Sequence, residues 1–257
     1  MKFQLLPSSF EDGLPSARQH LTSFIVDDRV AIDAGSLGFA VSERQRENVR
    51  DVLLTHAHLD HIAGLPLFID DLFSVLTEPI RIHATDLVIN VLERDIFNWS
   101  VYPRFSELSN ANGAVIEYHP IAPAAETQIA HLSIRPIDVN HQVPSTGFIV
   151  SDGNSLIAIS GDTAEMDGFW EASNSAGKLN ALLVECAFPN ELEDLALSSC
   201  HMTPDRLARE LSKFDGGDCP IYVINMKPMY RDRTIEQLNA LAIERLRILD
   251  VGKIYDF

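Results

Sequence analysis

Short apolar segments alternate with polar segments rich in Gly, Pro and Asp along the whole of this 257-residue chain. Apolar runs bounded by such turn residues are typical of buried β-strands. Tight turns are predicted at Asp27-Asp28 and at Ser151-Asp152-Gly153-Asn154. Strands are predicted over residues 2–6, 21–26, 29–32, 51–54, 80–83, 115–118, 128–140, 147–150, 156–160, 180–185 and 221–225.

Apolar residues spaced three and four apart predict helices between these strands. The helices cover residues 42–49, 85–98, 204–213 and 234–249, with Thr203 capping the third and a further helix starting near His61. Because strands followed by helices occur in both halves of the chain, we predict an α/β fold with two sheets face to face and helices outside. No linker, repeat or low-complexity segment divides the chain, so residues 1–257 are predicted to form a single domain.

The composition limits the partners of the protein. Apolar residues make up 46 % of the chain, and 37 acidic against 20 basic residues give a formal net charge of −17. A surface this negative repels nucleic acid and anionic lipid, so we expect neither a nucleic acid nor a membrane as a partner. An anionic substrate would need a strong local positive charge, which metal ions supply most simply.

Cysteine usage and hydropathy indicate a cytoplasmic protein. The three cysteines (Cys186, Cys200 and Cys219) form no Cys-x-x-Cys pair, and their odd number fits a reducing compartment. The apolar start of the chain is too short for a signal peptide, and no run approaches the ~18 apolar residues of a membrane span.

The strongest chemical signal is the segment Thr55-His56-Ala57-His58-Leu59-Asp60-His61, which comes directly after the predicted strand 51–54. Alternate side chains of extended backbone point the same way, so His56, His58 and Asp60 can all face one side. Imidazole and carboxylate ligands together suit Zn or a similar first-row ion. The alternative is a polar loop whose histidines occur together by chance.

Two further candidate ligands follow later strands. His141 comes after the predicted strand 128–140, and Asp162 follows Gly161 after the strand 156–160. Each is a weak signal alone, because Gly-Asp pairs and histidines at strand ends are usually ordinary turn or surface residues. Asp33 closes the strand 29–32, where it either supports a ligand histidine or forms a cap or turn.

These residues resemble a known family. The segment His56-x-His58-x-Asp60-His61 resembles the signature of the metallo-β-lactamase superfamily, and residues 58–65 are similar to the signature of class II cyclic-nucleotide phosphodiesterases within it. The resemblance extends in pieces over most of the chain, including residues 185–190, and implies an αβ/βα four-layer sandwich. It implies one metal ion held by His56, His58 and His141. It implies a second ion held by Asp60 and His61, with Asp162 bridging the two.

One position departs from the family pattern. The last metal ligand of the family is a histidine on the final strand, where this chain has Asn225 in Ile224-Asn225-Met226-Lys227-Pro228. A neutral amide oxygen is a weaker ligand for Zn than imidazole and suits harder ions better. We therefore expect one or two Zn ions, with a second site that is weak, vacant or open to Mn or Mg.

The resemblance also points to catalytic residues. His201 matches a His-x-Thr element shared with ribonuclease Z, in which it is a proton donor or charge clamp near the leaving oxygen. The near-neutral pKa of histidine suits a general acid, so we expect His201 to be catalytic. Asp60 is the second residue that we expect to be catalytic. The alternative for His201 is packing at a helix start. A Cys200 nucleophile is disfavoured, since adjacent side chains rarely face the same way.

Two segments are expected to contact the substrate. The resemblance implies a helical and aromatic insertion around residues 66–110, and the stretch 96–103 resembles the aromatic segment of class II cyclic-nucleotide phosphodiesterases. A planar purine could stack on Trp99 or Tyr102, whereas a small local core or a homodimer contact would explain the same aromatics. Lys227 and Arg231 follow Asn225 and could bind phosphate, or be ordinary surface charges.

The resemblance favours hydrolysis of a 3′,5′-cyclic nucleotide (cAMP or cGMP), a small anionic substrate, to the 5′-monophosphate. The alternative on the same fold is a hydrolase of other phosphodiesters, of thioesters or of lactones. Ribonuclease Z activity is disfavoured because a net charge of −17 suits tRNA poorly. Because Asn225 replaces a metal-binding histidine of the family, a second alternative is a protein of a different class, a nucleotide sensor that has lost catalysis.

Overall fold

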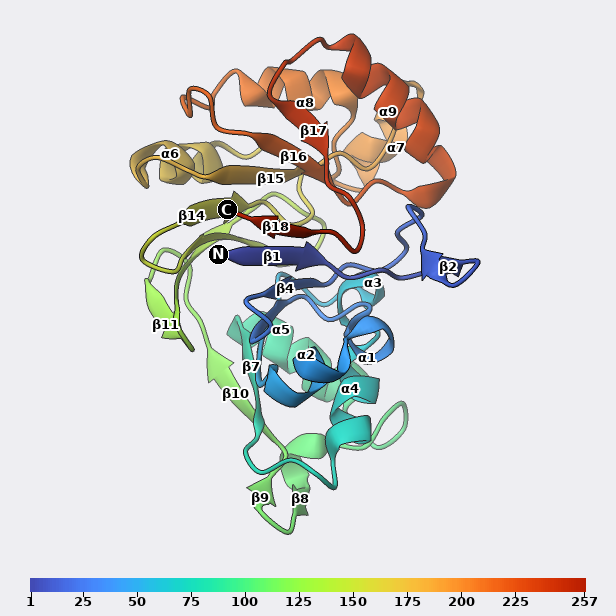
Figure 1. Ribbon diagram of the computed structural model, residues 1–257, viewed down its shortest axis with the longest axis vertical. Coiled ribbons are helices and arrows are strands. Elements are labelled where there is room, and N and C mark those ends of the chain that lie inside the picture. The colour runs from blue at the N-terminus through green and yellow to red at the C-terminus, as the bar shows by residue number, and fades with distance from the viewer.

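The computed structural model describes residues 1–257, and most of its strands form two seven-stranded sheets that face each other (Figure 1). The first sheet has the order β10 (Ile116–Pro120), β7 (Ile80–Ala84), β6 (Asp51–Leu53), β5 (Val30–Ile32), β4 (Phe24–Val26), β1 (Lys2–Leu5) and β18 (Ile254–Asp256). The second has the order β11 (Thr127–Ile129), β12 (Leu132–Asp138), β13 (Thr146–Ser151), β14 (Leu156–Ile159), β15 (Ala181–Glu185), β16 (Ile221–Ile224) and β17 (Leu246–Ile248).

Three layers of buried apolar side chains hold the sheets and helices together. The middle layer joins the sheets, with Phe24 and Leu53 from the first and Phe148 and Leu183 from the second. The outer face of the first sheet packs on α1 (Leu37–Ala40), α4 (Leu65–Leu72) and α5 (Asp86–Val91). The outer face of the second packs on α6 (Asp167–Ser175), α8 (Pro204–Leu211) and α9 (Arg231–Ala240). Helices therefore lie outside both sheets (Figure 1), and the predicted αβ/βα sandwich is confirmed.

Strand direction brings several loops to one edge of this sandwich. Strands β5, β6 and β7 are parallel, as are β14, β15 and β16. The carboxyl ends of parallel strands are where α/β folds place functional side chains, since neighbouring loops start there together. Asp33, His56, Asp162 and Asn225 each follow one of these strands within three residues.

The predicted helix 234–249 is wrong in its second half. Helix α9 ends at Ala240, and the chain turns at Ala242, which has a φ of 52°. Leu246 and Ile248 then lie in β17, which pairs in parallel with β16 and packs on the outer apolar layer of the second sheet. A short apolar run fits either a helix or a strand, and here the pairing partner decided the outcome.

The predicted strand 128–140 is a hairpin instead of one strand. Strands β11 and β12 pair in antiparallel fashion across a turn that contains Ala130, with a φ of 52°. The turn carries no Gly, Pro or Asn that would mark it in the sequence. The site is unaffected, because β12 still ends just before His141.

Three predicted helices differ from the structure in detail. Helix α5 starts where expected, with the Thr85 hydroxyl accepting from the Val88 amide, but the helical region 85–98 ends in a π-turn at Ile96. Helix α8 follows Thr203, whose hydroxyl is buried without a partner, so the predicted side-chain cap is wrong. The helix expected to start near His61 is divided into the single turn α3 (Leu59–Ile62) and α4. Helix α2 (Glu43–Asn48) agrees with the predicted helix 42–49.

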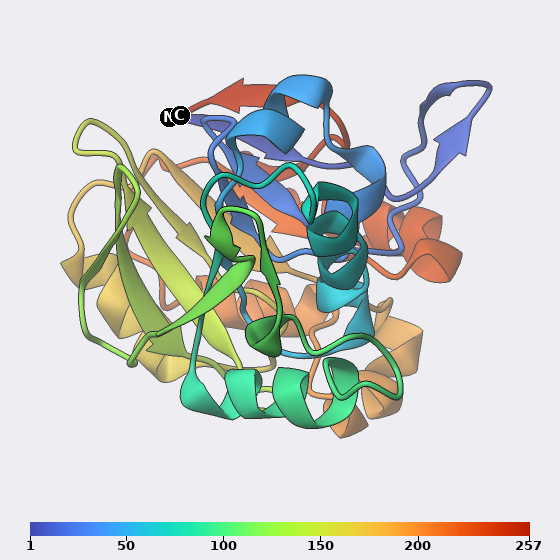
Figure 2. The ribbon, with the colours of Figure 1, turned by 90° about the horizontal axis from the view of Figure 1, so that it is seen from below.

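Two small hairpins and one short helix complete the elements used below. The hairpin β2 (Phe10–Glu11) and β3 (Leu14–Pro15) stands away from the body of the protein (Figures 1 and 2). The hairpin β8 (Ser109–Asn110) and β9 (Gly113–Ala114) lies at the lower end in Figure 1, and α7 (Glu193–Ser198) precedes the His201 loop. That residues 66–110 contain an insertion stays a prediction. No helix combines the length and apolar character that crossing a membrane requires.

Candidate metal centre

Six side chains from four separate loops meet at the edge where the parallel strands end. Their ligand atoms form three groups within which all atoms lie within 4.8 Å of one another. The groups are His56 with His58 and His141, His56 with His61 and Asp162, and His141 with Asp162 and His201. Residues 106 positions apart in the sequence are therefore neighbours, as His56 and Asp162 show.

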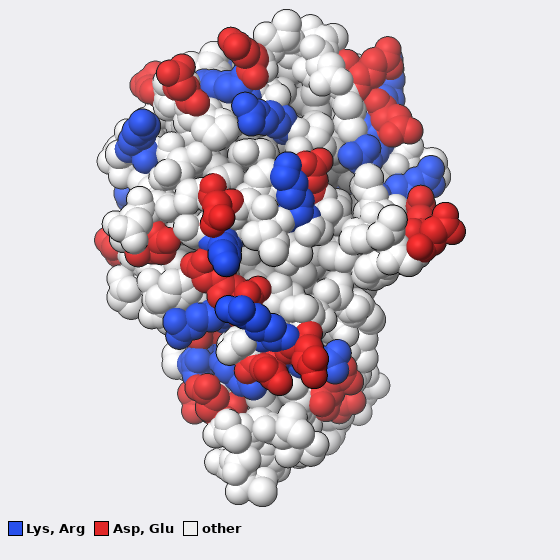
Figure 3. Space-filling model, viewed as in Figure 1, with Lys and Arg blue, Asp and Glu red and all other residues white.

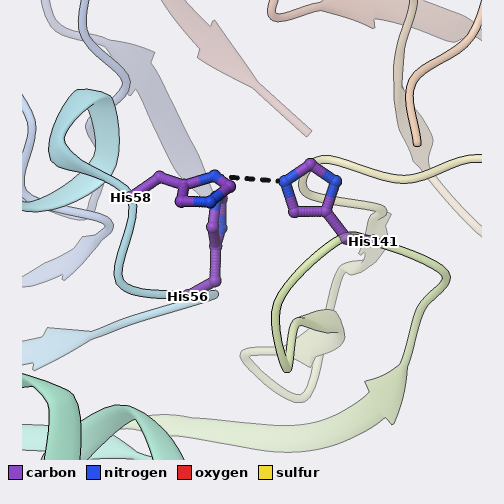
Figure 4. Close-up of side chains that lie close together, drawn as sticks. All are labelled: His56, His58 and His141. Carbon is purple, nitrogen blue, oxygen red and sulfur yellow. Dashed lines mark hydrogen bonds between the residues drawn. The ribbon is translucent and has the colours of Figure 1, made fainter. Parts of the chain in front are cut away.

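The first group is a triangle of three imidazoles (Figure 4). Nδ1 of His58 lies 3.2 Å from Nε2 of His141, and the ring of His56 is 4.7 Å and 4.9 Å from the two other rings. The backbone carbonyl of Cys200 accepts from Nδ1 of His141 at 3.1 Å, which leaves Nε2 as the free lone pair. Burial lowers the pKa of all three histidines, and the neutral imidazole is the form that binds metals.

Asp33 orients His61, a member of the second group. Nδ1 of His61 donates to the Asp33 carboxylate at 2.7 Å, and Nε2 of His61 points to Asp162 at 3.4 Å. Burial favours the neutral ring, but the carboxylates of Asp162 and Asp33 outweigh it and raise the pKa of His61. The hydroxyl of Thr55 bonds both Asp33 and Nδ1 of His56 at 2.9 Å. Two roles were considered for Asp33, support of a ligand histidine and a cap or turn. Its carboxylate contacts the candidate ligand His61, which favours the first role.

The donor set fits a divalent metal ion. Nε2 of His56 and Nε2 of His61 are buried and have no hydrogen-bond partner within the protein. An unpaired buried polar atom is costly, and a cation between these nitrogens and Asp162 would satisfy them. Neutral imidazoles combined with a carboxylate are the ligand chemistry of Zn and similar ions.

Asp60 lies beside this cluster but outside its three groups. Its carboxylate forms an ion pair with the ammonium of Lys227 at 3.1 Å, and both side chains are about one-third exposed. Burial disfavours the ammonium, but Asp60 and Asp162 outweigh this effect and raise the pKa of Lys227. We call residues 55–61, which carry four of the candidate ligands, the metal loop. The structure therefore brings Lys227, which was expected to contact the substrate, to this loop.

Asn225 occupies the position expected of the last ligand. Its Nδ2 donates to the Asp162 carboxylate at 2.5 Å, and its Oδ1 accepts from the Thr22 hydroxyl at 3.1 Å. The φ of 57° at this residue is a conformation that asparagine adopts more readily than most residues. The amide is thus in the centre, with its oxygen, the atom that would bind a metal, already engaged.

His201 is held at the edge of the cluster by Glu185, the last residue of β15. Nδ1 of His201 donates to Glu185 at 2.8 Å, and the His201 ring lies 5.0 Å from that of His141. Burial favours neutral His201, but Glu185 outweighs it and raises the pKa of the ring. The same carboxylate accepts from the Thr163 amide at 2.8 Å. No role for Glu185 was predicted from the sequence, although a charged residue that ends an apolar strand is a signal for one.

The remaining predicted contact residues lie apart from the cluster. Trp99 is 56 % exposed and donates to Glu107, whereas Tyr102 packs on Phe105 at 5.8 Å between ring centres. No hydrogen bond or ring contact joins either aromatic to the histidines. Tyr102 packs on the local core, as in the alternative interpretation, whereas Trp99 is largely exposed. Arg231 lines a small hollow together with Asn225.

Gly35 allows the metal loop to pack closely against the backbone at Thr22. A Cβ at this position would lie 2.0 Å from the Asp60 carbonyl oxygen and 2.8 Å from the Thr22 amide, which bond each other at 2.7 Å. We expect Gly35→Ala to lower the free energy of unfolding by about 1–3 kcal/mol and to weaken zinc binding, because the loop must move. Urea unfolding and zinc titration measure both effects.

Gly168→Ala is the matched control, since a Cβ in that helical position meets nothing within 4 Å. It should raise stability by roughly 0.5–1 kcal/mol through helix propensity and leave zinc binding unchanged. Wild-type stability and zinc affinity in Gly35→Ala would show that the loop is not held as the structure indicates.

Comparisons with known proteins agree with this geometry. The model of the beta-lactamase superfamily domain matches residues 28–218. A probable 3′,5′-cyclic-nucleotide phosphodiesterase of Yersinia pestis is 26 % identical over 209 residues, which cover 72 % of this chain and 59 % of the Yersinia protein. The 3′,5′-cyclic-nucleotide phosphodiesterase of Aliivibrio fischeri is 27 % identical over 239 residues, or 75 % of this chain and 70 % of that protein.

Solved structures share the fold along almost the full chain. Unliganded yeast PDE1 superimposes with a TM-score of 0.78 at 17 % identity, covering 98 % of both chains. The short form of human tRNase Z gives a TM-score of 0.69 at 16 % identity, covering 100 % of this chain and 99 % of the human one. Because the family model matches about three-quarters of its residues, this chain belongs to the metallo-β-lactamase superfamily, and it resembles the cyclic-nucleotide phosphodiesterases of that superfamily.

Proposed function

We propose that this protein is a metal-dependent phosphodiesterase that hydrolyses 3′,5′-cyclic nucleotides to 5′-monophosphates. The observation that carries the proposal is the pairing of a buried His/Asp cluster that fits metal ions with a His201–Glu185 pair at its edge. The family fold and this cluster support a metal-dependent hydrolase. The similarity to proteins named as cyclic-nucleotide phosphodiesterases supports the finer assignment.

In this proposal the chain holds its metals with the residues expected from the sequence. His56, His58 and His141 would hold one ion. His61, Asp60 and Asn225 would hold the other, and Asp162, which belongs to two of the ligand groups, would serve both. Divalent ions, when bound there, would lower the pKa of a water and neutralise charge on a phosphate. Asp33 keeps Nε2 of His61 free for this task by accepting from its other nitrogen.

The protein itself would supply the proton for the leaving group. Glu185 fixes the His201 ring through Nδ1 and raises its pKa, so Nε2 can carry a proton at neutral pH. In hydrolysis of a 3′,5′-cyclic nucleotide, that proton goes to the ribose 3′-oxygen as its bond to phosphorus breaks. Lys227, held beside Asp60, contributes a positive charge to the phosphate site.

A substrate comparison tests the proposal. The protein is incubated in Zn or Mn with cAMP, cGMP and bis(p-nitrophenyl) phosphate, and the products are separated by chromatography. We expect 5′-monophosphates from the cyclic nucleotides and no turnover by Asp60→Ala, with Asp256→Ala as the control on an exposed residue. Nucleotide binding without turnover in every metal would favour a sensor. Turnover of the chromogenic diester alone would favour a phosphodiesterase for other esters.

Metal content should reflect the weak ligand at position 225. Protein purified without chelator is expected to retain one zinc ion per chain, because the Asn225 oxygen already accepts from Thr22. Asn225→His should raise the content towards two, since histidine tolerates a positive φ better than most residues. Atomic emission measures both, and Asn239→His in the exposed face of α9 controls for an added imidazole. Two tightly held zinc ions in the wild type would refute this expectation.

A further inference from the structure

A hollow of about 530 Å³ lies beside the metal loop, on the side of Lys227. Its walls are the base of the β2–β3 hairpin with the segment that follows it, and the segment after β16. Its charged and titratable lining residues are Arg18, Lys227, Arg231, His20, Glu11 and Asp232. The volume falls within the usual range for small-molecule sites, about 300–1,000 Å³. The hollow is therefore large enough for a nucleotide-sized group.

Two arginines of this hollow have weak acidic partners or none. Arg18 forms no ion pair and no side-chain hydrogen bond, and Arg231 forms one ion pair, with Asp232 at 3.9 Å. Asp232 is turned to solvent with 99 % of its side chain exposed, and Glu11 accepts from the Ser16 hydroxyl. Over the face in Figure 3, acidic and basic side chains lie interspersed. Arg18, which has no partner, and Arg231, whose one ion pair is long and exposed, can therefore bind an anion that enters the hollow.

The hollow is continuous with the proposed phosphodiester site. The ammonium of Lys227 lines the hollow and also pairs with Asp60 of the metal loop at 3.1 Å. Arg231 lines both this hollow and the small one that contains Asn225. Lys227 and Arg231 thus connect the hollow with the centre, so a ligand whose phosphodiester lay there could place a further group in the hollow.

A cyclic mononucleotide carries a single negative charge, on the phosphate that the metals would hold, and this leaves the two arginines without a phosphate to bind. We propose that the hollow binds a second phosphate group of the substrate, so that this enzyme prefers phosphodiesters that bear a further phosphate. The inference rests on the proposed function and narrows its substrate class. Arg18 and Arg231 are its specificity residues, because a guanidinium can bind phosphate through two hydrogen bonds at once.

Binding measurements test the inference without requiring turnover. Isothermal calorimetry on zinc-loaded protein at fixed ionic strength compares AMP with adenosine 3′,5′-bisphosphate, which differ by one phosphate. We expect the bisphosphate to bind at least about tenfold more tightly to the wild type. The double variant Arg18→Gln/Arg231→Gln should bind both nucleotides within about twofold, and the single variant Arg18→Gln should lose part of the preference. Arg29→Gln, which removes an exposed unpaired arginine from the β4–β5 turn, should keep the full preference.

Equal affinities in the wild type would overturn the inference, and so would a preference that survives in the double variant. Hydrolysis of cAMP by the same preparations reports separately on the proposed function. Turnover of cAMP without a bisphosphate preference refutes only the second phosphate site. A preference that depends on the arginines, without cAMP turnover, refutes the cyclic-nucleotide activity and leaves the phosphate site standing.

Discussion

Replacing Asp162 by asparagine should lower kcat/KM for cyclic nucleotides by about 10³-fold or more, equivalent to roughly 4 kcal/mol of transition-state stabilisation. Asp162 belongs to two of the three ligand groups and is the only carboxylate in either. It is buried beside His61 and accepts from Asn225. The substitution keeps the size of the side chain but removes the negative charge that offsets bound cations.

Metal content is the second measurement on Asp162→Asn, and it should fall together with activity. Circular dichroism establishes that the variant is folded, and Asp256→Asn, at an exposed position without partners, controls for the loss of one carboxylate. A variant with wild-type activity and full metal content would show that Asp162 does not hold the ions. The assignment of the metal centre would then have to be abandoned.

Removing His201 should give the second large effect, and the size of the effect should depend on the leaving group. We expect His201→Ala to lower kcat for cAMP by about 10²–10⁴-fold, because the ribose 3′-oxygen needs a proton as it leaves. Hydrolysis of bis(p-nitrophenyl) phosphate should fall much less, since nitrophenolate is stable without protonation. A metal ligand would affect both substrates alike.

Zinc content separates the two roles further, because it should stay at the wild-type value in His201→Ala. His119→Ala removes a histidine that is 43 % exposed on β10 and should change neither substrate. Equal losses for cAMP and for the chromogenic diester would contradict a proton-donor role. Loss of zinc together with both activities would identify His201 as a ligand.

Local spacing was sufficient to predict the metal loop and most strands. His56, His58, Asp60 and His61 lie within six residues, so the chemistry of that loop is visible without a fold. Strands with a continuous apolar run, such as β6 and β15, were predicted almost to the residue. Both faces of these strands are buried, so nearly every position is apolar and the run itself marks the strand. The C-terminal segment was not, since Leu246 and Ile248 are compatible with a helix until β16 pairs with them.

Contacts between distant residues account for what the sequence left open. Asp33 had two equally plausible roles until the fold placed it 2.7 Å from His61. Glu185 was unassigned until the fold placed it beside His201, 16 positions away, and Lys227 was either a phosphate contact or a surface charge until its ammonium was found beside Asp60. The hollow between the β2–β3 hairpin region and Arg231 has no signature in any single segment.

By itself, the sequence determined the ligand types, the metal loop and the two-sheet class, because residue chemistry and short-range periodicity are local properties of a chain. Only the tertiary structure decided which carboxylate supports which histidine, where Asn225 directs its amide, and which arginines remain without partners. Those outcomes depend on strand order and direction, which bring the loops after β5, β6, β12, β14, β15 and β16 to one edge. Such long-range packing is set by how the whole core is buried, and no single segment encodes it.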